Sequence, residues 1–202
     1  NLITLYMFFE MMSIMTVPLV IHSRTKEAIA AGMKYLGYSI FGAGFGLFGL
    51  FFLNRFAGGN LIFQPGGVLN PSLVEGHETL VLVVTLIMII GFGAKAGMIP
   101  LQAWLPTAHP VAPAPASAVL SGIITKAGVL AIIRVIFYQV GTDMLRGTWV
   151  QYMLIILALT TVFVGSMLAF KEKLLKKRLA YSSVSQVSYV LFGLFLMTPA
   201  SV

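Results

Sequence analysis

Cysteine is absent from this chain, and histidine is rare. Without cysteine the chain can hold no disulfide, no thiolate-ligated iron–sulfur cluster and no c-type haem attachment. The three histidines, His22, His77 and His109, are far apart in the sequence and show no metal-ligand spacing. We therefore expect no metal site and no cofactor, so any redox chemistry must belong to a partner.

Charge is also scarce. Charged residues make up 9% of the chain, against about 25% in ordinary soluble domains, whereas 58% of the residues are hydrophobic. Apolar runs long enough to cross a bilayer predict an all-α polytopic membrane protein with about six transmembrane helices. We expect these helices at residues 2 to 21, 30 to 53, 79 to 104, 115 to 138, 149 to 170 and 179 to 198.

Basic residues are distributed unevenly among the connections. Eight lie in or beside the first and fifth connections (Arg24, Lys26, Lys34, Lys171, Lys173, Lys176, Lys177 and Arg178), and two lie in the second and fourth (Arg55 and Arg146). The positive-inside rule then places the first, third and fifth connections in the cytoplasm and Asn1 near the outside. The net charge of +7 is thus a topology signal. Because no soluble basic face with stacking aromatics is present, we expect no nucleic-acid partner.

Three isolated charges lie inside the apolar runs: Glu10, Lys95 and Lys126. Lys126 is about ten residues from either end of its segment, near the middle of a hydrocarbon layer about 30 Å thick. A charge at mid-helix costs about 2.5 to 3.5 kcal/mol, and charges kept at that cost commonly mark ion paths. We expect Glu10 and Lys95 to approach within ion-pair distance or one water of each other in the membrane interior.

Each of these residues also has a purely structural interpretation. Glu10 and Lys95 could form a static ion pair, although such pairs are costly and easily replaced by apolar residues. Lys126 has no acidic residue on its own helix, so pairing explains it less well. Lys34 lies near a helix end, where a lysine can snorkel to the membrane surface. His109, in a proline-rich loop, is either a plain loop residue or a residue at a channel mouth.

A break is predicted in the third helix. Gly97 and Pro100 follow Lys95 closely, and proline removes a backbone donor and clashes with the preceding turn. We expect the interruption between Gly93 and Trp104, followed by a loop that carries Pro106, Pro110, Pro113 and Pro115. Broken helices at membrane depth line polar cavities and mark ion sites in transporters. A packing kink through the neighbouring glycines is the alternative.

Three motifs resemble a known family. The stretch KAGMIPLQAWLPTAHPVAPAPASAVLSGIITKAG, residues 95 to 128, resembles the signature of the antiporter-like membrane subunits of respiratory complex I, energy-converting membrane hydrogenases and multisubunit cation/proton antiporters. NLITLYMFFEMMSI, residues 1 to 14, resembles the family's glutamate helix, and KKRLAYSSVSQVSYV, residues 176 to 190, its second-repeat motif. The chain starts at Asn1 without Met or a signal-peptide pattern, so we interpret residues 1 to 202 as a fragment of a longer protein.

The resemblance implies roles for particular residues. It makes Glu10, Lys95 and Lys126 the proton relay of a half-channel, and it places Lys34 at the family's basic position near the cytoplasmic end of helix six, as a possible further relay or channel-mouth residue. Members have fourteen helices with two inverted five-helix repeats, of which this chain would hold helices five to ten. One departure is that Leu174 and Leu175 stand where members often carry an acidic residue before the basic pair.

Three functions are consistent with the sequence. The first is an ion-pumping subunit of a redox-driven complex of the NADH-quinone oxidoreductase or membrane hydrogenase type, which the stretch HPVAPAPASAVLSGIITKAG favours by resemblance. The second is a subunit of a multisubunit cation/proton antiporter, and the third is a structural membrane scaffold. The first two imply the lipid bilayer, other membrane subunits and protons or sodium ions as partners. We expect a prokaryotic inner or plasma membrane.

Overall fold

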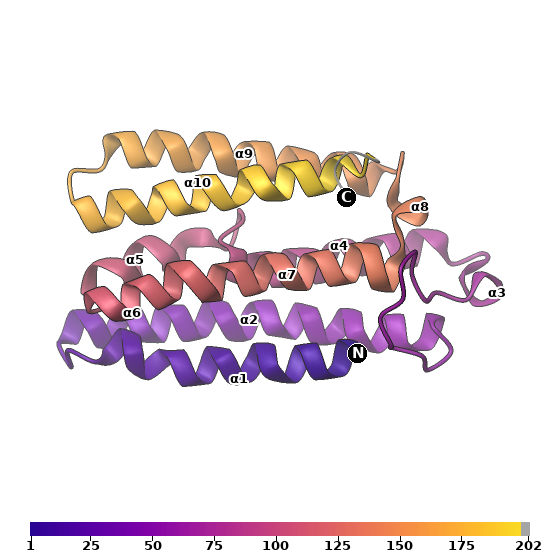
Figure 1. The fold of residues 1–202 in the computed structure, drawn as a ribbon, viewed down its shortest axis with the longest axis horizontal. Helices are drawn as coiled ribbons and strands as arrows, with labels where there is room; N and C mark the ends of the chain where they lie inside the picture. Colours follow the sequence, from indigo (N-terminus) through magenta and orange to yellow (C-terminus); the bar gives the residue numbers. More distant parts are fainter. Residues whose placement is uncertain (199–202) are drawn as a thin grey trace.

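The computed structural model describes residues 1–198, and long helices packed side by side make up most of it (Figure 1). The long helices are α1 (Leu2–Ile21), α2 (Lys26–Phe56), α4 (Glu78–Ala96), α9 (Trp149–Lys171) and α10 (Leu175–Leu196). A sixth membrane-length helix, Ala114–Val140, is built from α6 (Ala114–Val119), the π-helical η2 (Leu120–Ile124), α7 (Thr125–Val135) and the π-helical η3 (Ile136–Val140). Short elements complete the chain: α3 (Pro71–Val74), the 3-10 turn η1 (Gln102–Trp104), α5 (Leu105–Val111) and α8 (Thr142–Leu145).

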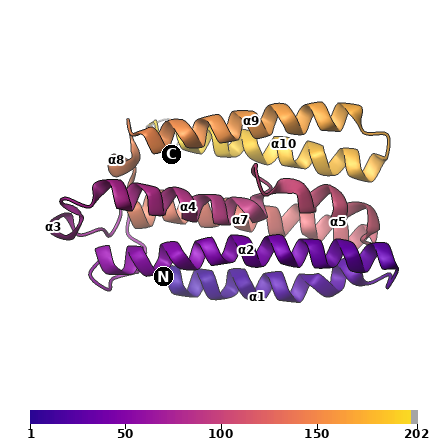
Figure 2. The same cartoon turned by 180° about the vertical axis from the view of Figure 1, so that it is seen from behind.

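The helices form three layers. Figure 1 shows α1 and α2 along one edge, α9 and α10 along the opposite edge, and α4, α5, α6 and α7 between them, and Figure 2 shows the same order from behind. The α1–α2 and α9–α10 connections lie at one end of the bundle, together with α5 and α6. The two strongly basic connections are therefore at the same end, and α3 and α8 are at the other.

The six expected spans are confirmed as six helices long and apolar enough to cross a membrane. Their bounds differ by more than two residues at three places. The second helix extends beyond the expected residues 30 to 53, from Lys26 to Phe56. The third span was expected to reach residue 104, but α4 ends at Ala96, because Gly97 adopts the left-handed conformation at φ +88°. The last helix begins at Leu175, before the expected residue 179, so that the basic residues Lys176 and Lys177 lie on its first turn.

Small residues allow close approach of helices, both between α2 and the middle layer and within the middle layer. A Cβ built on Gly42 of α2 would lie 2.6 Å from the carbonyl oxygen of Gly91 in α4. A Cβ on Gly128 of α7 would lie 2.5 Å from the backbone nitrogen of Ala96 and 2.9 Å from the carbonyl oxygen of Phe92. Neither glycine can carry a side chain without moving backbone. As elsewhere in membranes, small residues set the spacing of the helices.

The second connection closes the end of the bundle that carries α3 and α8. Backbone N–H groups of Gln64, Gly66 and Val68 donate to the carbonyls of Tyr138, Phe137 and Gln139, at distances of 3.0 to 3.1 Å. These carbonyls belong to the last turn of η3, where a helix leaves its acceptors unused. The loop therefore holds the end of the Ala114–Val140 helix by its backbone.

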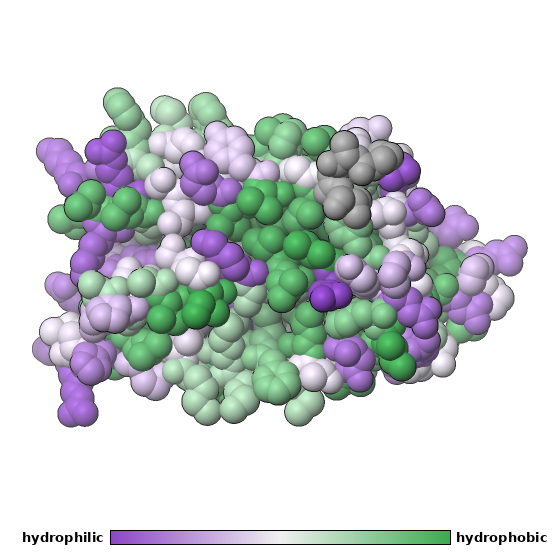
Figure 3. Space-filling view, in the orientation of Figure 1, coloured by the Kyte–Doolittle hydropathy of each residue, from purple (hydrophilic) through white to green (hydrophobic). Residues whose placement is uncertain are grey.

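The surface agrees with a bilayer environment. Figure 3 shows a face that is mainly apolar across its middle and hydrophilic toward both ends. Large apolar side chains on α1 and α9 stay exposed, among them Phe8 at 66% and Phe163 at 68%. Exposed apolar area of this extent is typical of lipid- or partner-facing helices rather than of a soluble monomer.

The close approach of α7 and α4 generates a stability prediction. Gly128→Ala should lower the free energy of unfolding by about 1 to 3 kcal/mol, because the new methyl group meets backbone atoms of Phe92 and Ala96. Gly122→Ala is the matched control, since a Cβ at Gly122 meets nothing within 4 Å. Thermal unfolding of the full-length protein in detergent should show a lower melting temperature for Gly128→Ala alone. Equal melting temperatures in the two variants would contradict the packing described.

Candidate functional site

Lys95 lies in the last turn of α4, in the interior of the bundle. Its side chain is 2% exposed, and its Nζ donates to the carbonyl oxygen of Phe9 at 2.5 Å and to Oγ of Ser13. The ammonium also lies 3.5 Å from the centre of the Phe9 ring. Both partners belong to α1, so a single buried charge joins the first helix to the third membrane span.

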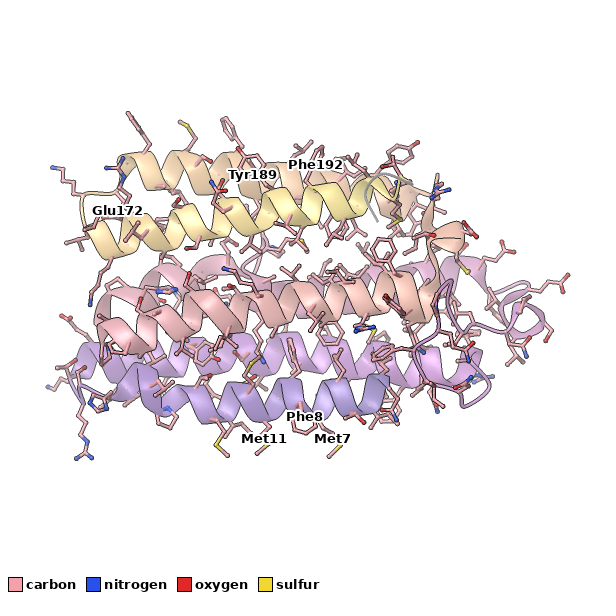
Figure 4. All side chains as sticks on the ribbon, in the orientation of Figure 1. Met7, Phe8, Met11, Glu172, Tyr189 and Phe192 are labelled. Atoms are coloured by element: carbon pink, nitrogen blue, oxygen red, sulfur yellow. The ribbon has the colours of Figure 1, made fainter. Side chains whose placement is uncertain are left out.

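The exposed and buried faces of α1 are distinct. Met7, Phe8 and Met11 point away from the bundle (Figure 4), and they are 64%, 66% and 52% exposed. Phe9 and Ser13 are 5% and 1% exposed, on the face that meets α4. Lys95 thus reaches α1 on its protein-facing side, where the carbonyl of Phe9 and the Ser13 hydroxyl replace the water that an ammonium would otherwise bind.

Glu10 does not form the expected ion pair with Lys95. Among residues 1–198 the ion pair within 4.0 Å is Lys177–Glu172, at 2.8 Å. Glu10 is partly buried, its Oε1 is buried without a hydrogen-bond partner, and it interacts electrostatically with Lys95. The direct ion pair is therefore absent from the described residues, because Lys95 donates its hydrogen bonds to Phe9 and Ser13 instead, and an approach of Glu10 and Lys95 to within one water molecule stays a prediction.

The break after Lys95 is built by specific contacts. Gly97 has φ +88°, and the Ile99–Pro100 peptide is cis. The indole Nε1 of Trp104 donates to the carbonyl oxygen of Ala94 at 2.7 Å, and the N–H of Ile99 donates to Oγ1 of Thr161 in α9 at 3.1 Å. The end of α4 is thereby held on both sides, and the interruption expected between Gly93 and Trp104 is confirmed.

Lys126 follows directly on a second irregular stretch. The π-helical η2 ends at Ile124, and Nζ of Lys126 donates to the carbonyl oxygen of Ser121 at 2.7 Å. π-helical turns inside α-helices are rare and frequent at functional sites. The Lys126 side chain is exposed in this structure. Two positions further on, Gly128 packs on Ala96, so the helices that carry Lys126 and Lys95 touch beside both lysines.

A cavity of about 380 Å³ adjoins Lys126. It lies between the Ala114–Val140 helix and α10, and its lining includes His109, Ser117, Lys126, Lys176 and Gln186. The structure thus brings Lys126 and His109 to one polar space. Lys176 also donates to the carbonyl oxygen of Ala112 at 3.2 Å.

His109 is a helical residue, whereas the sequence predicted a loop. It lies in α5, is 4% exposed, and its Nδ1 is 2.6 Å from Oγ of Ser117. Its Nε2 is buried without a partner. Burial, together with the nearby Lys176 charge, lowers the pKa of His109 to about 4. The imidazole is therefore neutral near pH 7 and can accept a proton only when its surroundings change.

Lys34 stands apart from this arrangement. It lies on α2 and is exposed. Two residues that the sequence analysis did not single out are buried nearby instead: Thr16 on α1 and Tyr35 on α2, at 7% and 0% exposed. The signal for Thr16 was present in the sequence, since it follows Ser13 by three residues and is therefore its neighbour on one helix face. No such spacing pointed to Tyr35.

The chemistry available here is proton transfer. Within residues 1–198 no group of three or more His, Cys, Asp or Glu side chains could hold a metal ion. The interior instead contains a carboxyl group, an ammonium group, hydroxyls and, next to Lys126, a polar cavity. Groups of this kind can take up and pass on protons.

Comparison with known proteins places the chain in a family. A family model described as NADH:quinone oxidoreductase/Mrp antiporter, TM, matches residues 1–202. Hydrogenase-4 component B of Escherichia coli (strain K12) is 35% identical over 92% of this chain and 26% of that protein. F(420)H(2) dehydrogenase subunit N of Methanosarcina mazei and a Na(+)/H(+) antiporter subunit of Bacillus subtilis (strain 168) are each 30% identical over 100% of this chain and 40% of their own length.

Solved structures give the same result. A chain of the archaeal membrane-bound sulfane sulfur reductase has a TM-score of 0.79 and 28% identity, over 96% of this chain and 39% of that one. A chain of the Mrp complex from a Dietzia species has a TM-score of 0.81 at 23% identity, over 100% of this chain and 36% of that one, and this likeness concerns the fold alone. This chain spans less than half the length of each of these relatives. It belongs to the NADH:quinone oxidoreductase/Mrp antiporter transmembrane family.

Proposed function

We propose that this chain is the proton-translocating part of an antiporter-like membrane subunit in a redox-driven complex. The observation that carries the proposal is Lys95, which is 2% exposed at the end of a broken membrane helix and is bonded to the helix of Glu10. A buried ammonium at this depth is costly, and proteins keep such groups for ion paths. A structural scaffold would need neither the charge nor the break.

Glu10 and Lys95 together can act as a switch. Burial disfavours a charged ammonium, and a nearby carboxylate favours it. In this structure Glu10 interacts with Lys95 electrostatically but makes no hydrogen bond to it through its buried Oε1. A movement of Glu10 toward Lys95 would load the lysine with a proton, and a movement away would release the proton. Lys126, on the neighbouring helix, is the proposed acceptor, reached through water.

The surroundings of the chain follow from its relatives. Two of them are named as a hydrogenase component and an F(420)H(2) dehydrogenase subunit, so we assign the chain to a multisubunit redox complex in a prokaryotic inner or plasma membrane. Residues 1 to 202 would supply helices five to ten of fourteen. The basic α1–α2 and α9–α10 connections would face the cytoplasm. Other membrane subunits would cover part of the exposed apolar surface.

A multisubunit cation/proton antiporter is the second candidate. It is favoured by the 30% identity to the Na(+)/H(+) antiporter subunit of Bacillus subtilis over the whole chain. Both candidates use the same interior residues and differ in what drives the ion. Neighbouring genes decide between them: subunits with cysteine-ligated clusters or a nickel site indicate redox drive, and their absence indicates an antiporter.

Lys126 provides the most direct test of the proposal. Lys126→Met keeps length and apolar character but cannot hold a proton, so proton translocation by the complete complex should be abolished. Lys126→Arg should fail as well, because a guanidinium effectively never deprotonates. Lys126→His should retain part of the activity, since imidazole titrates near neutrality. Proton uptake into vesicles containing the complex is measured, with the driving reaction followed in parallel.

The matched control for this test is Lys171→Met, which removes an exposed lysine in the last turn of α9, outside the Lys95–Lys126 region. It should translocate protons at a rate close to that of the wild type. Wild-type translocation in both Lys126→Met and Lys126→Arg would refute the relay.

Glu10 gives a second prediction. Glu10→Gln removes the charge that acts on Lys95 and should stop proton translocation while the subunit still assembles, because the amide has nearly the same volume. Glu27→Gln is the control, since Glu27 is exposed in the first turn of α2. Assembly is followed by native electrophoresis and translocation in the same vesicles. Equal translocation in the two variants would remove the switching role of Glu10.

A further inference from the structure

Buried hydroxyl groups continue from Lys95 toward the end of the bundle that carries the α1–α2 connection. Ser13 accepts a hydrogen bond from Lys95. One turn further along α1, Oγ1 of Thr16 is 2.7 Å from the hydroxyl oxygen of Tyr35 in α2. Ser13, Thr16 and Tyr35 are 1%, 7% and 0% exposed. Three hydroxyls from two helices therefore lie in the protein interior, and the first of them, on Ser13, contacts the buried ammonium.

The hydrogen bond between Thr16 and Tyr35 can run in either direction. The carbonyl oxygens of Met12 and Ser13 lie 2.8 and 3.0 Å from Oγ1 of Thr16. A threonine hydroxyl has one hydrogen and two acceptor positions. When the Thr16 hydrogen points to one of these carbonyls, Tyr35 is the donor and its hydrogen points toward α1. In that arrangement a proton can move from Tyr35 to Thr16.

The Tyr35 ring packs against Trp104, which also donates a hydrogen bond to the last turn of α4. The rings of Tyr35 and Trp104 have their centres 4.8 Å apart, and Trp104 donates through Nε1 to the carbonyl oxygen of Ala94. Ala94 directly precedes Lys95. A shift of the α4 end would therefore move Trp104. Because the Tyr35 ring packs on Trp104, the Tyr35 hydroxyl would move as well.

We propose that Thr16 and Tyr35 form a hydroxyl relay that supplies protons to Lys95, an inference that rests on the proposed function. Tyr35 gives its proton to Thr16 and takes another from water on its far side. Thr16 rotates its own hydrogen away from the backbone carbonyl and passes it to one water molecule between itself and Ser13, and that water passes one on through Ser13 to neutral Lys95. Each hydroxyl gains one proton and loses one, so the net change is a single proton delivered to the amine.

The far side of Tyr35 is closed in this structure. Val20 and Ala31, one turn further toward the bundle end, pack with Leu105 and Ala108 of α5 in the apolar cluster that also holds Tyr35. These four side chains are 0%, 7%, 0% and 0% exposed. Apolar constrictions gate by excluding water. Tyr35 thus separates a polar path on the Lys95 side from a dry layer, which must take up water before the tyrosine is reloaded.

Removal of single hydroxyl groups tests the relay. Tyr35→Phe keeps the ring on Trp104, and Thr16→Val keeps the volume of the side chain, so both should assemble. We expect each to slow proton translocation per assembled complex by at least about tenfold, because a positioned proton-transfer group contributes on the order of 10² to 10⁴ in rate. Thr16→Ser, which restores a hydroxyl, should recover near wild-type rates. Tyr38→Phe is the matched control: Tyr38 lies on the same helix and is only partly buried.

Each outcome is decisive when Lys126→Met is measured beside these variants. Wild-type rates in Tyr35→Phe and Thr16→Val, with Lys126→Met inactive, would overturn the relay and leave the proposed function intact. Wild-type rates in all three would overturn both. A loss in Thr16→Val that Thr16→Ser does not recover, or an equal loss in Tyr38→Phe, would indicate packing rather than proton transfer and would also overturn the relay.

Discussion

The hydrogen bonds between Lys95 and α1 are the contacts on which the rest of the arrangement depends. An ammonium that is 2% exposed in a membrane protein must find acceptors inside the protein, and here it finds the carbonyl of Phe9 and the hydroxyl of Ser13. These bonds fix the rotation of α1, which turns Met7, Phe8 and Met11 outward and the side of Ser13 and Thr16 inward. The same rotation leaves Glu10 beside the lysine without a hydrogen bond to it. One buried charge thus sets which face of the first helix carries the polar groups.

Both lysines of the proposed relay lie next to a departure from regular α-helix. Lys95 precedes the left-handed Gly97, and Lys126 follows the π-helical turn Leu120–Ile124. Irregular backbone inside a membrane is tolerated where protein or a polar cavity supplies partners for the freed groups. Trp104 and Thr161 supply them at the first site, through bonds to the Ala94 carbonyl and the Ile99 N–H. The 380 Å³ cavity lies beside the second. In each case the lysine is therefore within two residues of irregular backbone.

Much of the fold could be predicted because membrane helices are encoded by long apolar runs, and the break after Lys95 could be predicted because Gly97 and Pro100 act on the backbone locally. The partners of Lys95 could not, since whether an ammonium meets a carboxylate or a carbonyl depends on how two helices are rotated against each other. The sequence wrongly predicts a loop at His109, because Pro106 and Pro110 usually interrupt helices. In the short α5, Pro106 occupies the first turn, where N–H groups have no intrahelical acceptor, and the helix forms nonetheless. The π-helical turns likewise could not be predicted, since no feature of the residue pattern indicates them.

The hydrogen bonds from Gln64, Gly66 and Val68 to the last turn of η3 have a mechanical consequence. They fix one end of the Ala114–Val140 helix to the neighbouring loop, while its other end, α6, starts after Pro113 and has no side-chain cap. A helix held at one end can tilt but cannot slide along its axis. In such a tilt, displacement would grow with distance from the pivot, and Lys126 would move less than Ser117 and more than Gly128. The glycine contact with Ala96 lies nearer the pivot, where displacement would be smallest, so a tight fit there is compatible with a change in the width of the cavity beside His109.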